Sequence, residues 1–242
     1  DADITADQVD QLTSLYETEV LPPFVTAGVE IDAAELVPTS VAGRYLQHHY
    51  ISENSNGFDE RDLLDDAGDG SGYSAAHATH HPLLRALMEN AGMNDLLIVD
   101  AETCDVVYTT KTRIDLGGHS LEGRYAESGL GKVIDKLTTV AVGNSVISDT
   151  FFYVPTRGAP VFFLATAVRS GSSVVGAVVT EVPVGALTGV VTAEQDWRLL
   201  GLGETGESYI VGSDRTLRTD TRAWLQDPDD YLSRHLDRYD DA

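Results

Sequence analysis

Eight side chains in the middle of the chain have the types and spacing needed to bind a small charged solute. Asp149, Phe151 and Tyr153 alternate along a strand-like run, which places them on one face of that strand. Asp149 would pair with an amine and Arg113 or Lys111 with a carboxylate, while the aromatic rings would shield both pairs from water. Taken singly, a strand tyrosine is more often core packing, and a basic residue at a strand end is more often solvated. The candidate ligand-binding set is Tyr108, Lys111, Arg113, Asp115, Tyr125, Asp149, Phe151 and Tyr153.

An acidic, glycine-rich run at Asp65–Gly70 (DDAGDG) raises the question of a calcium site, because hard cations prefer several carboxylate oxygens on a bent loop. The EF-hand pattern is not met, since Ala67 holds its third position and Ala76 its twelfth, where a bidentate glutamate is needed. The run is therefore predicted to be a turn that caps the helix after it, and no metal site is predicted.

Three histidines follow this run. His77 and His81 are one helical turn apart, as two zinc ligands would be, but Pro82 perturbs that turn and the chain has no HExxH pattern. Helix packing or surface exposure is the favoured role for them and for His80, with a response to pH left open.

The sequence patterns of catalysis are missing. The chain has no GxSxG elbow, no GxxxxGK phosphate loop and no GxGxxG after a strand. Residues 201–206 (GLGETG) resemble a phosphate loop, yet they precede a strand instead of opening a helix, so their amides would not converge on an anion. We therefore expect no enzymatic activity, no catalytic residues and no cofactor.

Composition and charge narrow the class of protein further. The 242 residues, 42% of them hydrophobic, are enough for one or two packed domains. The formal charge of −23, from 39 acidic and 16 basic side chains, argues against nucleic-acid binding and suits a salty exterior. Cys104 is the single cysteine, which excludes an internal disulfide. No apolar run reaches the roughly 20 residues of a membrane helix, no signal peptide opens the chain, and its abrupt ends are those expected of an ectodomain cut from between two membrane spans.

The first ninety residues are predicted to be mainly helical. Ile4, Leu12, Leu15 and Val20 follow helical spacing until Pro22-Pro23 interrupts it. A second helix is expected from its caps at 38–40 to residue 51, then a loop at 59–72, then a third helix at 73–90.

After residue 95 the apolar period becomes strand-like. We expect a hairpin at 96–113, a loop at 115–131, a short helix to about residue 137, and strands at 145–154, 160–169 and 173–182. An exit helix at 184–195 leads to a second hairpin at 209–222, which repeats the apolar run, turn and Thr–Arg ending of the first, and to a helical stretch at 223–238. The predicted fold is α+β, with a helical lead, a five-stranded antiparallel sheet and the start of a second such module.

Several stretches resemble one group of double Cache domains, the tandem PAS-like extracellular sensors of bacterial membrane receptors. They are YLQHHYI at 45–51, LLDDAGDGSGYSAAHATHHP at 63–82, YAESGLG at 125–131 and GLGETGESYIVGSDRTLRTDTR at 201–222. The resemblance covers most of residues 35–222 and is most specific in DDAGDG and GETGESYIVG.

The resemblance implies a sensor on a chemoreceptor, histidine kinase or adenylate/guanylate cyclase, tethered to the membrane and placed on its extracellular or periplasmic side. It implies a helical lead at 1–90, a membrane-distal module at 91–198 that binds a small solute (an amino acid, amine or organic acid) beneath a lid that includes Tyr125, and a partial membrane-proximal module at 199–242 that relays the change.

Two other functions stay open from the residues alone. The apolar stripe of the first helix could pair two copies of the chain, which would make the protein a dimerisation module. The acidic run and the histidines could build a metal-dependent hydrolase, a weaker alternative that metal analysis would test.

Overall fold

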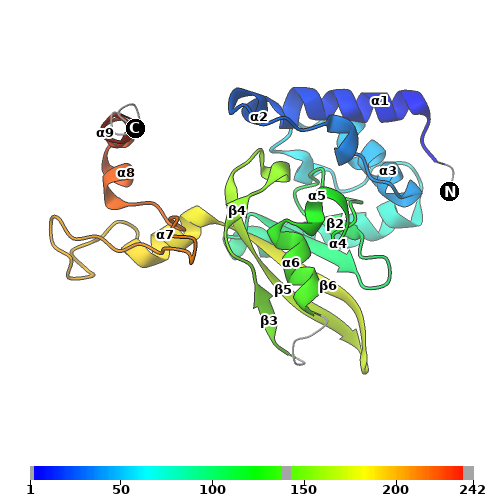
Figure 1. Ribbon diagram of the computed structural model, residues 1–242. Helices are drawn as coiled ribbons and strands as arrows, with labels where there is room; N and C mark the ends of the chain where they lie inside the picture. Colours follow the sequence, from blue (N-terminus) through cyan, green and yellow to red (C-terminus); the bar gives the residue numbers. More distant parts are fainter. Residues whose placement is uncertain (1–2, 138–142, 237–242) are drawn as a thin grey trace. The chain divides into compact units, whose positions relative to one another are not determined.

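The computed structural model describes residues 3–137 and 143–236, which form two compact units, Asp1–Val182 and Pro183–Ala242. Each unit is described by itself (Figure 1). Within the described ranges, no helix is both long enough and apolar enough to cross a membrane. The division predicted at residues 90 and 198 stays a prediction.

The first unit opens with the expected helical segment. Helix α1 (Ala6–Leu15) begins at a capping box, in which the Thr5 hydroxyl accepts the Gln8 amide and the Gln8 side chain accepts the Thr5 amide. The chain continues through a π-helical turn, η1 (Tyr16–Val20), into α2 (Pro22–Thr26). Pro22 and Pro23 occupy the first turn of α2, where a missing amide hydrogen costs nothing.

The apolar stripe of this segment packs inside its own chain. Leu12 and Val20 are fully buried, and Leu15 packs against the same core cluster, which also contains Ile51 and Ile114 from later segments. The stripe therefore contributes to the core of its own chain, and pairing of two copies of the chain stays a prediction.

Two more helices follow where they were predicted. Ser40 caps α3 (Val41–Gln47), and a π turn, η3 (His48–Ser52), extends it. Two short helical turns were not expected: η2 (Ala33–Leu36) precedes α3, and η4 (Arg61–Leu63) lies inside the predicted loop. Ser71 then caps α4 (Gly72–Asn90), which runs through Pro82.

The sheet of the first unit is antiparallel and has six strands where five were expected. Its order is β2-β1-β6-β5-β3, with β4 also paired to β5. The predicted strand at 145–154 is split, because the Ser148 side chain accepts the Phe163 amide at 2.9 Å and takes the place of a ladder partner. The strands are β1 (Asp95–Asp100), β2 (Val106–Thr109), β3 (Ser145–Ile147), β4 (Phe151–Phe152), β5 (Pro160–Ser170) and β6 (Ser173–Pro183).

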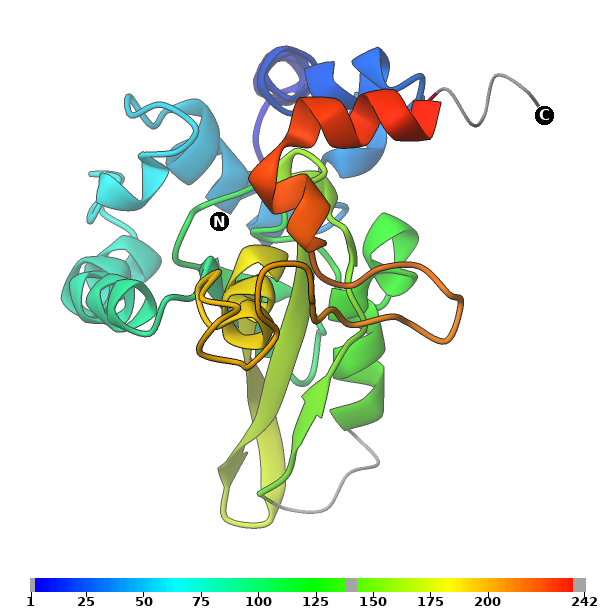
Figure 2. The same cartoon turned by 90° about the vertical axis from the view of Figure 1, so that its left-hand side faces the viewer.

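Helices cover both faces of this sheet (Figure 2). Leu97 and Val99 belong to the core cluster that contains α6 (Gly129–Leu137), while Leu96 and Ile98 pack with Met88 of α4. Successive strand residues point to opposite faces, so one strand supplies both cores. A short helix, α5 (Gly123–Ala126), precedes α6, and a 3-10 turn, η5 (Val154–Thr156), follows β4.

The second unit is mostly helix and turn. It contains α7 (Val184–Thr192), α8 (Arg222–Gln226) and α9 (Pro228–Leu236). The hairpin predicted at 209–222 is reduced to a single bridge between Val211 and Leu217, because the Thr219 hydroxyl accepts the Ile210 amide at 2.9 Å and ends the ladder. The helical stretch predicted at 223–238 consists of two helices, α8 and α9, separated at Asp227, and Asp237 and Arg238 lie outside the described residues.

Candidate functional site

Four charged side chains are buried together on the sheet face that also packs against α6. Asp95 begins β1, and Glu181 is its direct partner in β6. Each alternates in phase with core residues of its own strand, so both point to the same face. Arg113 and Asp115 come from the segment that follows β2. The three acids are 0% exposed and Arg113 is 8% exposed, so burying this group is costly unless its members have partners.

Hydrogen bonds satisfy one oxygen of each acid. Asp95 Oδ1 accepts the amides of Leu96, Thr110 and Lys111 at 2.7–3.0 Å. Glu181 Oε1 accepts Arg113 Nη1 at 3.0 Å and also the Asn94 side-chain amide.

Asp115 completes the group through Tyr153, whose hydroxyl donates to Asp115 Oδ2 at 2.8 Å. The bond joins the segment after β2 to the residue that follows β4, two segments far apart in the sequence. Tyr153 is itself 2% exposed, so this contact is inside the core.

The second oxygen of each acid has no partner. Asp95 Oδ2, Asp115 Oδ1 and Glu181 Oε2 are buried and make no hydrogen bond in the structure. Three carboxylates against one guanidinium would leave two uncompensated negative charges if all were ionised. A buried charge without a partner is strongly unfavourable, so the group either holds protons or receives a positive charge from outside.

The pKa values of the four side chains reflect this excess of negative charge. Burial raises the pKa of Glu181 to about 7, although Arg113 acts to lower it. Burial likewise raises the pKa values of Asp95 and Asp115 above the usual aspartate range. Burial alone would lower the pKa of Arg113, but Glu181 and the other two carboxylates raise it, so the guanidinium stays charged. The group therefore responds to pH close to neutrality through Glu181.

Aromatic rings lie beside the acids. The Tyr153 ring packs edge-on against Phe151 and Phe163, with centroids 5.6 and 5.1 Å away. Tyr125 donates its hydroxyl to the Ile114 carbonyl at 3.1 Å. Tyr125, Phe151 and Tyr153 line a cleft of about 260 Å³ between α5 and β4. Tyr153 lines this cleft and also contacts Asp115, so its side chain lies between the cleft and the buried acids.

Gly129 shows how tightly this aromatic group is packed. A side-chain carbon added at Gly129 would lie 1.9 Å from the Phe151 ring, so only glycine permits α6 to start so close to it.

The structure brings together five of the eight side chains predicted for the site. Arg113, Asp115 and Tyr153 are in the buried group, and Tyr125 and Phe151 line the adjoining cleft. Whether they contact a ligand stays a prediction.

The other three predicted residues lie elsewhere. Tyr108 points to the opposite face of the sheet, where its hydroxyl bonds to His81 Nδ1 at 2.7 Å. Lys111 extends to Asp62 and forms an ion pair with it at 2.7 Å. Asp149 is exposed in the gap between β3 and β4, because the alternation that placed it beside Phe151 is broken there.

Asp95 and Glu181 are the site residues that the sequence prediction missed. Each is a carboxylate in phase with the apolar core residues of a strand, in DLLIVD and VVTEV. A charge at an inward position of a buried strand is the signal that could have found them, since such residues are rarely buried without a purpose or a partner.

The histidines that raised the question of a metal are used in packing contacts. His77 Nδ1 bonds to the Asp65 carbonyl at 2.8 Å, and His81 Nε2 to the Asp62 carbonyl at 2.7 Å. The two rings stack at 4.2 Å. Among residues 3–137 and 143–236, no three His, Cys, Asp or Glu side chains are grouped so that they could hold a metal ion.

Comparisons with known proteins give matches among solved structures alone. No protein-family model and no curated protein matches the chain. The ligand-binding domain of the Pseudomonas fluorescens chemoreceptor CtaA with L-isoleucine is 14% identical with a TM-score of 0.38, over 67% of this chain and 58% of that one. The ligand-binding domain of the Pseudomonas aeruginosa PAO1 amino acid chemoreceptor PctC with GABA is 10% identical with a TM-score of 0.39, over 68% of this chain and 64% of that one. The domain of the Campylobacter jejuni chemoreceptor Tlp3 with 4-methylisoleucine is 9% identical with a TM-score of 0.42, over 92% and 73%.

All three are ligand-binding domains of bacterial chemoreceptors. The chain spans less than two thirds of the length of the CtaA domain, at 58%. The likeness is distant, with TM-scores of 0.38 to 0.42.

Proposed function

We propose that the first unit is the sensory part of a bacterial membrane receptor and that it binds a small solute carrying an ammonium group. The observation that carries this proposal is the set of three buried carboxylate oxygens without partners on Asp95, Asp115 and Glu181. An ammonium group carries hydrogen-bond donors and one positive charge, so it would supply a donor and a charge to an acid of this group that lacks both.

Among the solute classes expected from the sequence, this group of acids favours the amine. The two cations that were to bind a ligand carboxylate are already paired, Arg113 with Glu181 and Lys111 with Asp62. An organic acid without an amine would bring another negative charge to a group that already has too many. An amino acid would be accepted through its ammonium end.

In this proposal the solute reaches the buried acids through the cleft beside Tyr125 and Phe151. Its volume of about 260 Å³ suits a small molecule, and its aromatic rings would cover the apolar part of an amine or stack on its cation. Binding would displace the Tyr153 hydroxyl from Asp115 or add a donor to the oxygen that Tyr153 leaves free. Either event changes a contact between the segment after β2 and the segment after β4, which is a local change that a receptor could relay.

A thermal-shift screen of amino acids and primary amines, each paired with its 2-hydroxy or alcohol counterpart, tests the proposal. We expect stabilisation by one or more amines and by none of the matched compounds that lack nitrogen. A ligand at one hundred times its dissociation constant adds about 2.7 kcal/mol to the free energy of unfolding. Stabilisation by acids that lack an amine, or by no amine at all, would refute the proposal.

Calorimetry with two matched variants locates the site. Asp95→Asn removes one of the buried charges and should abolish binding of the amine found in the screen. Asp149→Asn makes the same change at an exposed aspartate that the sequence had placed in the site, and should leave binding intact. The reverse result would return the site to Asp149. If Asp95→Asn does not fold, Glu181→Gln serves in its place, because Gln retains the shape and the acceptor oxygen.

A further inference from the structure

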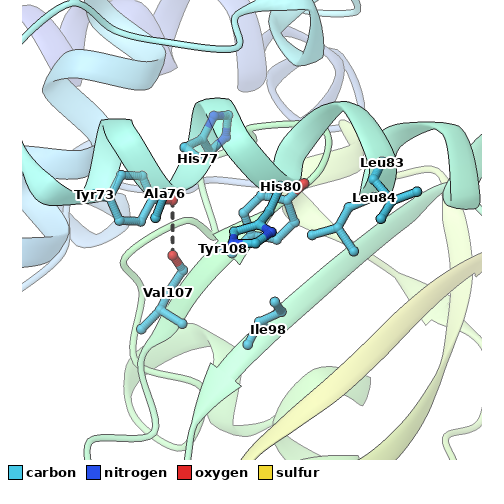
Figure 3. Close-up of a pocket in the computed structure, with 9 residues that line it drawn as sticks. All are labelled: Tyr73, Ala76, His77, His80, Leu83, Leu84, Ile98, Val107 and Tyr108. Carbon is cyan, nitrogen blue, oxygen red and sulfur yellow. Dashed lines mark hydrogen bonds between the residues drawn. The ribbon is translucent and has the colours of Figure 1, made fainter.

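A second cavity lies on the opposite face of the same sheet (Figure 3). It has a volume of about 430 Å³ and lies, partly open to solvent, between α4, which contributes Tyr73, Ala76 and Leu84, and the outer faces of β1 and β2, which contribute Ile98 and Tyr108. Ile98 alternates out of phase with Asp95, so the sheet separates this cavity from the buried acids.

The walls of this cavity are apolar, and their polar atoms are mostly occupied. The Tyr73 hydroxyl donates to the Val107 carbonyl at 3.1 Å, a bond that joins the first turn of α4 to β2 at one end of the cavity (Figure 3). The Tyr108 hydroxyl is bonded to His81. None of the residues that line the cavity is an acid, lysine or arginine. An ion would therefore lose part of its hydration there without gaining a counter-charge, which favours an uncharged ligand.

Two histidines of α4, His77 and His80, supply the remaining polar atoms of the lining. His77 lines the cavity, and its Nδ1 must carry the hydrogen because its partner, the Asp65 carbonyl, can only accept. Nε2 is then a hydrogen-bond acceptor. Burial lowers the pKa of His77 to about 4, so the ring is neutral at pH 7 and keeps this acceptor. His80, which is exposed, also lines the cavity.

Size and lining match those of small-molecule sites. Ligand pockets span about 300–1,000 Å³ and combine hydrophobic and aromatic walls with a few polar atoms, as this cavity does. The bond between Tyr73 and Val107 limits the cavity along α4, so a ring-sized molecule fits the space better than a helix of a partner protein would.

We propose that the cavity between α4 and the β1–β2 face is a second binding site, for a small, uncharged, aromatic molecule that carries one hydrogen-bond donor. This site is independent of the ammonium site on the other face of the sheet. It gives the first unit a way to bind a solute that the acid group would not recognise.

Calorimetry with 2-naphthol tests the proposal on the full chain, and 2-naphthoate is the matched anion of nearly the same shape. We expect 2-naphthol to bind with one site per chain and 2-naphthoate not to bind. Ala76→Trp places an indole in the cavity and should weaken binding at least about tenfold by filling it. Ala75→Trp is the matched control, because Ala75 is an exposed neighbour on α4 that does not line the cavity.

Three results would overturn the proposal. The first is no binding of 2-naphthol to protein whose circular dichroism shows it folded. The second is equal binding by the Ala76→Trp and Ala75→Trp chains, which would put the probe elsewhere. The third is a dimer in sedimentation that Ala76→Trp dissociates, which would show that a second copy of the chain covers the cavity. The amine screen is unaffected by each of these outcomes, so the two sites are tested separately.

Discussion

Replacing Glu181 by Gln is the sharpest test of the buried acid group. Glu181 has a pKa of about 7 in the folded chain against 4.5 for an ordinary glutamate. A raised acid pKa means that the folded state holds the proton more tightly than the unfolded state. The associated stability is fully present below about pH 4.5, and it is lost as the pH rises through about 7. The rise in the pKa of Glu181 from 4.5 to about 7 corresponds to about 3 kcal/mol.

Glu181→Gln should remove this loss, because Gln is neutral at every pH and keeps an oxygen for Arg113 and Asn94. About 2 of these 3 kcal/mol of stability are lost between about pH 5.5 and 8. In this range the protein is away from its pI and therefore more soluble. We expect the variant to match the natural chain most closely at the acid end and to be more stable than it by about 2–3 kcal/mol at about pH 8.

Urea unfolding followed by circular dichroism at four pH values in this range gives the free energies. Glu89→Gln, the same change at an exposed position on α4, controls for the net charge of the chain. A difference between the two variants that does not change with pH would refute the reasoning. So would a Glu181→Gln chain that is less stable than the natural one at about pH 8, because the ion pair with Arg113 would then outweigh the excess negative charge.

Two further predictions concern single residues of the first unit. The folded pKa of His77 is about 4 against the ordinary 6.5, so protonation favours the unfolded state and stability falls as the pH falls from about 6.5 towards 4. Between about pH 7 and 5.5, His77→Gln should remove about 1 kcal/mol of this loss of stability, measured by urea unfolding. His80→Gln, at the exposed neighbour, should keep the loss. The same dependence of stability on pH in both variants would contradict this prediction. Gly129→Ala should cost about 1–3 kcal/mol at pH 7, because the added carbon meets the Phe151 ring. Gly72→Ala, where nothing lies within 4 Å, should be neutral or slightly stabilising, and similar losses at both glycines would show that the packing around Phe151 is loose.

The order of elements could be predicted from the sequence wherever local chemistry decides the structure. Ser40 and Ser71 cap the two helices that were expected after them, because a hydroxyl before an apolar, helical run satisfies an amide that the helix leaves free. The long strands were equally clear, since burial alternates along β5 and from Ala177 to Val182 of β6, and the two strands meet at a short turn around Gly171.

The sequence failed where a side chain takes the place of a backbone partner. Ser148 accepts the Phe163 amide and splits one strand into two, and Thr219 accepts the Ile210 amide and shortens the second hairpin to one bridge. In both segments the apolar pattern is that of a strand. Nothing in that pattern tells whether an amide will pair with a carbonyl or with a hydroxyl.

Only part of the candidate site could be predicted, because the same break between β3 and β4 affects it. Arg113 and Asp115 follow a strand in the sequence, and the structure does bury them together with Glu181. Asp149 alternates with Tyr153 in the sequence, and that alternation does not survive the break between β3 and β4. Charge at an inward position of a strand was a better guide than charge beside an aromatic residue, because only the first implies burial.

Glu181 and His77 lie on opposite faces of one sheet and oppose each other in their response to pH. Between about pH 5.5 and 7, Glu181 removes about 1–2 kcal/mol of stability as the pH rises, while His77 restores about 1 kcal/mol over the same interval. Their contributions therefore offset to within about 1 kcal/mol, and the natural chain should show little pH dependence from these two groups. A natural chain whose stability does not change with pH would not mean that Glu181 and His77 have ordinary pKa values. Opposite slopes in the two single variants would reveal them, because each variant removes one of the two compensating groups and leaves the other to act alone.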